Sequence, residues 1–482
     1  MKKVDFNVVT DWEKGLIGWD SPEDPANPKN WSSAKKWRTM GLVAVSCFML
    51  PLASTLFAPG VEYVILEFHQ TNATVETFMI SIFVLGFGWG PLLCHAPMSE
   101  LFGRKYVICV SNLVFALFNI GCSEAHNTAT FMACRFLGGF LGCAAMVVGG
   151  GVIGDMFKPQ QMGRAASIFA LGPLMGPVVG PVAGGFIAET IGWRWTFRIL
   201  LILGMIMTVL FFVLVEETSA PAILRVKARR LRKEHNRSDL ISHIDKGRDL
   251  RPAVIWWQCF SRPLRLLFTN PIVTFAAVYM GFAFAYLYMF VTTITYVFRD
   301  YYGFSTGLTG LAYLGLGTGL MIGVSSVGAT SDKLVAYLTK KNNGVRQPEF
   351  RLRPLYLSCL CIPASMFWYG WAIEQHRHWI AVILSMIPMG IGMVSSMLPI
   401  QTYLIEVFAP YGFAPSATAA GNCLRMTAGA FFPLCGTKLY ASLGFGWGCS
   451  LLGFLAFGCC GSMALAFNIY GQRLRVAFPP KL

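Results

Sequence analysis

The chain has 482 residues, of which 55% are hydrophobic and only 13% charged, and its formal net charge is +15. Soluble domains carry about a quarter charged residues, so this composition excludes an ordinary soluble domain and predicts a protein that lies in a membrane. A basic balance can also indicate a nucleic-acid partner, but the positions of the basic residues, given below, argue against nucleic acid.

The first 38 residues are polar, which predicts a tail and no cleaved signal peptide. Turn-forming residues at 24–32 lead into Lys35-Lys36-Trp37-Arg38, a basic edge that carries a tryptophan. Such an edge is typical of the place where a chain enters a bilayer. We therefore expect residues 1–38 to form a cytoplasmic tail.

Twelve apolar runs follow the tail, and most are near the ~20 residues that cross the hydrocarbon of a bilayer. They cover residues 39–60, 77–97, 106–123, 129–154, 165–188, 195–215, 272–298, 307–330, 355–373, 379–403, 414–440 and 446–470. A basic stretch at 216–271 divides them into two sets of six, and a tail at 471–482 ends the chain. The pattern predicts an all-α membrane protein with 12 transmembrane helices in two six-helix bundles, at 39–215 and 272–470.

Lysine and arginine are distributed unevenly between the two sides of this arrangement. With the N-terminus inside, 32 of the 39 basic residues fall in inside segments, 3 in outside loops and 4 within spans. This bias predicts that both termini are cytoplasmic and that the basic residues face the anionic inner leaflet. The same topology puts Asn72-Ala-Thr74 outside, so Asn72 is a candidate for N-glycosylation.

The loop between the second and third spans contains Glu100, Gly103, Arg104 and Lys105. Gly103 permits a tight turn, and the acid and the bases can pair across the loop or with a neighbouring helix, which predicts a conformational latch. The alternative is an ordinary basic anchor, which explains the two bases but not the acid and the glycine. Asp155 follows the fourth span. It either forms a second latch with Arg164 or is a solvated acid of the loop.

Arg135 lies inside the predicted fourth span, followed by glycines at 138, 139 and 142. A charged residue at this depth is costly and usually faces protein or water, which favours a functional role. Since an arginine does not readily release a proton, its role would be to shift the pKa of a nearby acid or to hold a water chain. The alternative is an arginine that snorkels to the outer interface.

The predicted fifth span carries glycine and proline at every fourth position. The residues are Gly172, Pro173, Gly176, Pro177, Gly180, Pro181, Gly184 and Gly185. Residues four apart share a helix face, so the glycines predict a groove for close packing and the prolines predict a fixed bend. A plain small-residue packing face explains the glycines but not three prolines in register.

Two sets of residues are candidates for the wall of a substrate cavity. One is an aromatic face in the seventh span, formed by Tyr279, Phe282, Tyr286 and Phe290. The other is the polar pair Asn422 and Arg425 in the eleventh span. Aromatic faces bind flat apolar ligands but also pack against lipid or other helices, and the polar pair either holds the bundle together or lines the cavity.

Several of these segments resemble motifs of drug exporters in the major facilitator superfamily. The run from Gly176 to Ile187 resembles the antiporter motif of the fifth helix, and the segment from Arg135 to Gly142 resembles the fourth-helix motif of proton-driven exporters. The loop at 97–105 resembles the superfamily's motif between helices 2 and 3. Three further segments, at 24–38, 215–233 and 403–434, are similar to those of fungal drug:proton antiporters with twelve spans.

The resemblance implies a secondary active transporter that exports toxic or drug-like organic molecules by proton antiport and alternating access, with Arg135 in proton coupling. It implies a multi-pass protein of the fungal plasma membrane, with the vacuolar membrane as the alternative. The proton gradient would supply the energy in place of a cofactor. The expected partners are a small apolar substrate, protons and the lipid bilayer, and we expect a monomer.

Other functions were weighed against this one. A proton-coupled uptake symporter or a polyamine transporter of the same fold stays open. A membrane-embedded enzyme is disfavoured because the 7 histidines are scattered and because no metal-ligand spacing, phosphate-binding loop or Ser/His/Asp set is present. We therefore predict no metal site, and 14 cysteines that are reduced and unpaired.

Overall fold

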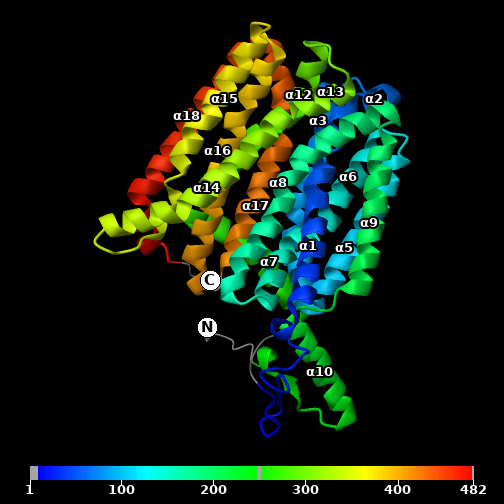
Figure 1. Cartoon of the computed structure of the whole chain (residues 1–482), viewed down its shortest axis with the longest axis vertical. Helices are drawn as coiled ribbons and strands as arrows, with labels where there is room; N and C mark the ends of the chain where they lie inside the picture. The colour runs from blue at the N-terminus through cyan, green and yellow to red at the C-terminus, as the bar shows by residue number, and fades with distance from the viewer. Residues whose placement is uncertain (1–8, 247–250, 412, 480–482) are drawn as a thin grey trace.

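The computed structural model describes residues 9–246, 251–411 and 413–479, and its long helices form two bundles side by side (Figure 1). A small unit that contains α10 projects from one end of the N-terminal bundle. We call this the linker end of the molecule and the opposite end the distal end. The described chain is almost entirely helical, as the sequence predicts.

The N-terminal bundle contains α1 (Ser33–Thr55), α2 (Val61–Glu67), α3 (Ala73–Gly90), α4 (Ala96–Phe102), α5 (Arg104–Ser123), α6 (Thr128–Gly142), α7 (Ala144–Met156), α8 (Pro159–Thr190) and α9 (Arg194–Leu214). The linker contains α10 (Ala220–Glu234) and α11 (Pro252–Thr269). The C-terminal bundle contains α12 (Pro271–Asp300), α13 (Thr306–Ala312), α14 (Leu314–Lys341), α15 (Leu355–Glu374), α16 (Trp379–Phe408), α17 (Ala414–Phe431) and α18 (Gly436–Ala477). Two short strands, β1 (Leu16–Ile17) and β2 (Ile241–Ser242), and single helical turns such as η2 (Ala58–Gly60) and η3 (Pro91–His95) complete the described elements.

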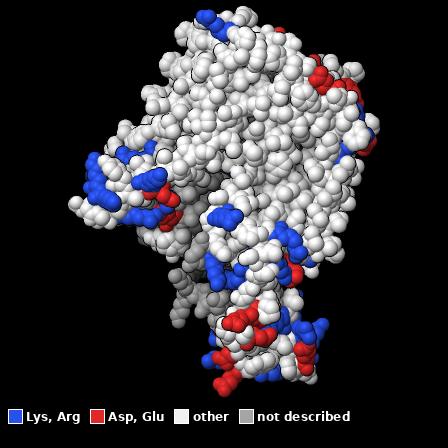
Figure 2. Space-filling view, in the orientation of Figure 1, with Lys and Arg blue, Asp and Glu red and all other residues white. Residues whose placement is uncertain are grey.

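Eleven stretches of the described chain are long and apolar enough to cross a membrane, whereas the sequence predicts twelve spans. The last stretch, Ala414–Ala477, has 64 residues, about three times the ~20 that one span needs. Within it the backbone of Gly444 leaves the helical conformation, with φ 72°. Charged side chains gather at the linker end and on the projecting end of α14, and an uncharged belt separates them from the distal end (Figure 2). The protein is therefore a multi-pass membrane protein.

The repeated glycines of α8 lie against the backbone of α1. A side chain at Gly172, Gly176, Gly180 or Gly184 would meet α1 atoms between Ala44 and Leu56. Gly185, one position further, instead faces Thr306 and Gly307 at the start of α13 (Thr306–Ala312) in the C-terminal bundle. The glycine groove therefore seats α8 on α1, while the adjacent face of the same helix meets the other bundle.

We expect Gly184→Ala to lower the stability of the protein by about 1–3 kcal/mol, because the added methyl group overlaps the carbonyl oxygen of Leu56. Gly163→Ala in the same helix is the control, since a side chain at this position meets no atom within 4 Å. It should be neutral or stabilising, by up to about 1 kcal/mol. Thermal unfolding of the purified proteins in detergent measures both effects, and equal stabilities would contradict the packing described here.

The N-terminal tail and the linker fold together, which the sequence analysis did not anticipate. Strand β1 of the tail pairs in parallel with β2 of the linker. Ile17 and Trp19 of the tail pack on Ala228 and Leu224, so the apolar face of α10 is covered by protein. This face of α10 therefore contacts the tail and the rest of the linker, and it is not free to lie on a membrane surface.

Candidate functional site

The two bundles meet through polar contacts at the distal end. The carboxylate of Glu62 pairs with the Arg299 guanidinium at 2.5 Å. The carboxylate of Glu189 accepts hydrogen bonds from the Gly307 amide at 2.5 Å and from the Ser305 hydroxyl at 3.1 Å. In both contacts an acid of the N-terminal bundle holds a donor of the C-terminal bundle. We call these contacts the distal gate.

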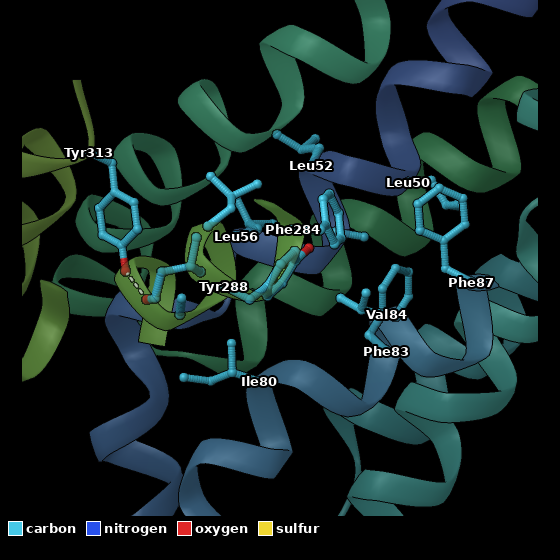
Figure 3. Packing of buried hydrophobic residues seen from close by; sticks show 14 of the residues in the cluster. Leu50, Leu52, Leu56, Ile80, Phe83, Val84, Phe87, Phe284, Tyr288 and Tyr313 are labelled. Atoms are coloured by element: carbon cyan, nitrogen blue, oxygen red, sulfur yellow. Dashed lines mark hydrogen bonds between the residues drawn. The ribbon is translucent and has the colours of Figure 1, made fainter. Parts of the chain in front are cut away.

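An apolar layer lies below this gate, toward the middle of the molecule. In Figure 3, Tyr288 and Phe284 of α12 lie between α1 and α3 of the other bundle. Tyr288 donates a hydrogen bond to the Ser54 hydroxyl at 3.2 Å, and Thr295 donates one to the Ala58 carbonyl at 3.4 Å. The labelled residues around the two rings include Leu52, Leu56, Ile80, Phe83 and Val84. These contacts seal the molecule between its centre and the distal end.

At the linker end the bundles are apart. Figure 2 shows a recess between the projecting end of α14 and the linker end of the N-terminal bundle. The residues of α8 at 163–171 are mostly exposed or half-buried. Gly150 and Gly154 of α7 have no atom within 4 Å of the position that a side chain would take. The molecule is thus closed at the distal end and open at the linker end.

Arg135 of α6 is buried at the centre, with 2% of its surface exposed. Its guanidinium donates to the carbonyl oxygens of Ala53 at 2.9 Å, Ser54 at 3.5 Å and Ile80 at 3.3 Å. Three rings surround it at 4.9–5.8 Å, those of Phe57, Phe83 and Phe197. This burial rules out the alternative that Arg135 snorkels to the outer interface. The side chain ties α6 to α1 and α3.

Arg425 of α17 occupies a similar position in the other bundle and is also 2% exposed. Its Nη1 donates to the Met397 sulfur at 3.2 Å, and its guanidinium lies 4.8 Å from the centre of the Phe284 ring. The Nε atoms of Arg425 and Arg135 and the Oδ1 of Asn422 are buried and have no hydrogen-bond partner among the described residues. The two arginines are linked by a short chain of contacts: the Phe284 ring beside Arg425 lies 5.0 Å from the Tyr288 ring, and Tyr288 donates to Ser54, whose carbonyl accepts from Arg135. They therefore belong to one site.

Three of the four residues in the predicted aromatic wall pack within their own bundle. Tyr279, Tyr286 and Phe290 are buried and contact their own bundle: the two hydroxyls donate to the carbonyls of Leu355 at 3.3 Å and Leu452 at 2.8 Å, and the Phe290 ring lies 4.5 Å from that of Tyr369. Phe282 is half-buried and packs against two apolar clusters, of which one lies in its own bundle and the other spans both bundles. The aromatic residues of α12 that lie between α1 and α3 are Phe284 and Tyr288, four apart on another face of the helix, and neither is among the four predicted.

The predicted latch at Gly103 has other partners than the sequence suggests. Gly103 adopts φ 91°. Arg104 pairs with Asp155 at 3.2 Å, whereas the two possibilities given above for Asp155 are a pair with Arg164 and a solvated loop acid. The side chain of Glu100 forms no ion pair within the described residues. The backbone carbonyl of Glu100 accepts a hydrogen bond from Arg225. The acid that completes the loop is Glu217, which the sequence analysis missed.

Glu217 caps the first turn of α5. Its carboxylate accepts from the backbone amides of Arg104 at 2.8 Å and Lys105 at 3.1 Å. The same carboxylate fills the space beside Gly103 that a side chain would need. A carboxylate at a helix N-terminus also interacts favourably with the helix dipole. The linker is thereby fixed to the loop between the second and third spans.

Glu217→Ala should therefore destabilise the protein by about 1–3 kcal/mol, because it leaves the amides of Arg104 and Lys105 without their acceptor. The adjacent Glu216→Ala is the control, since Glu216 forms only an exposed ion pair with Lys35, worth about 0–1 kcal/mol. Thermal unfolding distinguishes the two. A larger effect at Glu216 than at Glu217 would contradict the capping role.

Asn72 lies at the distal end and caps α3. Its side-chain oxygen accepts from the Thr74 amide at 3.0 Å, and the residue is exposed. The side-chain nitrogen, which carries the sugar in a glycoprotein, makes no hydrogen bond within the described residues. Asn72 is thus accessible for the predicted modification.

The fold and this central site define a membrane transporter with two bundles around a path between them. The family model of the major facilitator superfamily matches residues 43–433. The chain is 42% identical to the MFS transporter cpaT of Aspergillus oryzae, over 95% of this chain and 92% of that protein. It is 40% identical to the efflux pump radE of Floropilus chiversii, over 96% of this chain and 85% of that protein. The chain belongs to the major facilitator superfamily.

Solved structures agree on the fold. A D-xylose-proton symporter superposes with a TM-score of 0.65 at 15% identity, covering 89% of this chain and 97% of its own. A partially occluded, inward-open structure of the xylose transporter XylE from E. coli gives a TM-score of 0.63 at 16% identity, covering 93% and 98%. With this membership the protein is a transporter and not an enzyme.

Proposed function

We propose that the protein is a secondary active exporter of toxic or drug-like small organic molecules, driven by proton antiport. The observation that carries this proposal is the asymmetry between the two ends: a sealed distal gate, an open linker end, and two buried arginines at the centre. A path open to one side at a time is what alternating access requires. The efflux pump radE is similar over most of the chain, which supports export.

We place the linker end in the cytoplasm, together with both termini. This orientation follows the concentration of lysine and arginine in segments at that end. It requires an even number of spans, so we propose that the stretch Ala414–Ala477 crosses twice, with its break near Gly444. Asn72 then lies outside, as glycosylation requires. We propose the plasma membrane as the location.

Proton coupling has two parts in this proposal. Arg135 holds the centre of the N-terminal bundle, where its charge favours the transporter states that solvate or neutralise it. Glu62 and Glu189 at the distal gate supply the carboxylates. Protonation of either acid from outside removes its negative charge, which weakens its contact with the C-terminal bundle and favours opening to that side.

Transport into inverted vesicles with an imposed pH gradient tests the function. The vesicle lumen corresponds to the outside of the cell, so an acidic lumen should drive accumulation of substrate from a panel of lipophilic compounds. The accumulation should stop when an ionophore collapses the gradient. Movement that is independent of the gradient would contradict antiport, and accumulation that needs the gradient reversed would indicate an uptake symporter.

A further inference from the structure

The two buried arginines at the centre carry charge that the protein does not neutralise. Neither Arg135 nor Arg425 forms an ion pair with an aspartate or glutamate in the described ranges, and each is 2% exposed. Two partly buried arginines elsewhere in the chain have carboxylate partners: Arg104 pairs with Asp155, and Arg225 with Asp245. An uncompensated buried charge is among the most costly features of a protein interior, and at membrane depth it usually marks a functional site.

We propose that the substrate is an organic acid, whose anionic group binds at Arg425 in the field of Arg135. This inference rests on the proposed transport function and adds the chemical class of the substrate. The acid would be a carboxylic acid or an acidic enol on a mostly apolar body.

The two arginines differ in how well the protein satisfies them. Arg135 donates to three backbone carbonyls, so most of the hydrogen-bond donors of its guanidinium group already have acceptors. Arg425 makes one hydrogen bond within the described residues, to the sulfur of Met397. A thioether is a weak acceptor, and an unbranched methionine side chain repacks readily. An anion can therefore displace Met397 from Arg425 at little cost, whereas it would have to compete with carbonyls at Arg135.

The surroundings of Arg425 suit the rest of such a molecule. Asn422 lies three residues before it on the same helix face, with its Oδ1 buried and unpaired. The amide group can turn to donate to the anion or accept from a hydroxyl of the substrate. Phe284 lies beside the guanidinium at 4.8 Å and offers an apolar surface for a ring. A planar guanidinium binds a carboxylate through two parallel hydrogen bonds, which fixes its orientation.

The same site disfavours cationic drugs. The two guanidinium groups lie on either side of the Phe284–Tyr288 ring pair, and no carboxylate of the described chain lies among the groups that contact Arg135 or Arg425. A cation entering between the bundles would meet repulsion from both sides in a medium of low dielectric constant. A neutral molecule would leave the Arg425 charge unpaired. An anion is the ligand that removes this cost.

Binding of three matched probes to the full-length protein in nanodiscs tests the proposal. Pyrenebutanoate, pyrenebutanamide and a pyrenebutyl trimethylammonium salt share one apolar body and differ in charge. Fluorescence titration should show that the acid binds at least about tenfold more tightly than the amide, and the cation least of all. Equal affinities for acid and amide, or tightest binding of the cation, would overturn the proposal.

Variants assign the effect to the arginine. Arg425→Gln should reduce the preference for the acid over the amide to about twofold or less, and Arg425→Lys should retain part of it, since lysine keeps the charge but not the fork. Lys438→Gln is the control, because it removes an exposed positive charge from the same bundle. A preference that persists in Arg425→Gln, or that falls equally in Lys438→Gln, would contradict the assignment.

If Arg425→Gln does not fold, the Arg425→Lys and Asn422→Ala variants still decide, since each should lower the affinity for the acid more than for the amide. A selective acid site in a protein without gradient-driven flux would contradict the exporter and leave the site standing.

Discussion

Replacing Arg135 by glutamine is expected to reduce gradient-driven export by at least about 100-fold. The guanidinium makes three hydrogen bonds to backbone carbonyls of α1 and α3. A hydrogen bond to a charged group is worth about 1.5–3 kcal/mol, and about 1.4 kcal/mol corresponds to a tenfold change in rate, so the loss of two such bonds accounts for the effect. Arg135→Lys should be impaired less, by about tenfold, because it keeps the charge without the planar fork.

The assay is accumulation in inverted vesicles with an acidic lumen, at matched protein levels. Arg198→Gln is the matched control, since Arg198 forms an exposed ion pair with Glu124 at the distal end. It should transport within about twofold of the original protein, as expected for an exposed pair. Unchanged export by a folded Arg135→Gln protein would remove Arg135 from the mechanism.

Reversing one charge of the distal gate should hold the transporter open to the outside and stop export. In Arg299→Glu the ion pair with Glu62 is lost and the introduced acid also lies beside Asp300, which contacts Arg299 at 2.6 Å in the original chain. Repulsion between the two side chains replaces attraction, which changes the free energy of the closed gate by about 1–2 kcal/mol for such partly exposed groups. This corresponds to about a tenfold change in the equilibrium constant for gate opening. We expect the exchange Glu62→Arg with Arg299→Glu to restore much of the export.

The rate at which a reagent added outside labels Thr295→Cys measures how often the distal gate opens. Thr295 is buried beneath it, with its hydroxyl on the Ala58 carbonyl. In a background depleted of native cysteines, an impermeant maleimide should label this position slowly, about tenfold faster with Arg299→Glu, and slowly again in the exchanged pair. Acidifying the outside should speed labelling relative to that of a fully exposed cysteine, since low pH lowers the thiolate fraction of both, and Glu62→Gln should weaken that response. A rate that none of these changes alters would refute the gate.

The sequence was sufficient for the class of fold and for its most periodic features. Glycines every fourth residue in Leu171–Ile187 predict close helix packing, and the structure seats them on α1. An arginine inside an apolar run usually faces protein or water because lipid does not solvate its charge, so Arg135 could be singled out from the sequence. Both inferences depend on local patterns, which sequence shows directly.

The errors concern which neighbour a given face meets. In α12 nearly every side chain is buried, so the faces that contain Tyr286 and Tyr288 look alike in sequence, and only packing against α1 and α3 separates them. Glu217 lies more than 100 residues from the amides it caps, and a pairing at such separation leaves no local signal. The tail and linker strands, β1 and β2, have two residues each, too short for a strand pattern.

The central claim is that the two bundles rock, opening one end as they close the other. Two pairs of spin labels, in a background depleted of native cysteines, measure this directly: Ser167 with Thr330 at the linker end, and Ile191 with Leu308 at the distal end, all exposed positions. Imposing the proton gradient together with a transported compound should populate a state in which the first distance shortens while the second lengthens. Distances that do not change, or that change in the same direction, would contradict the account.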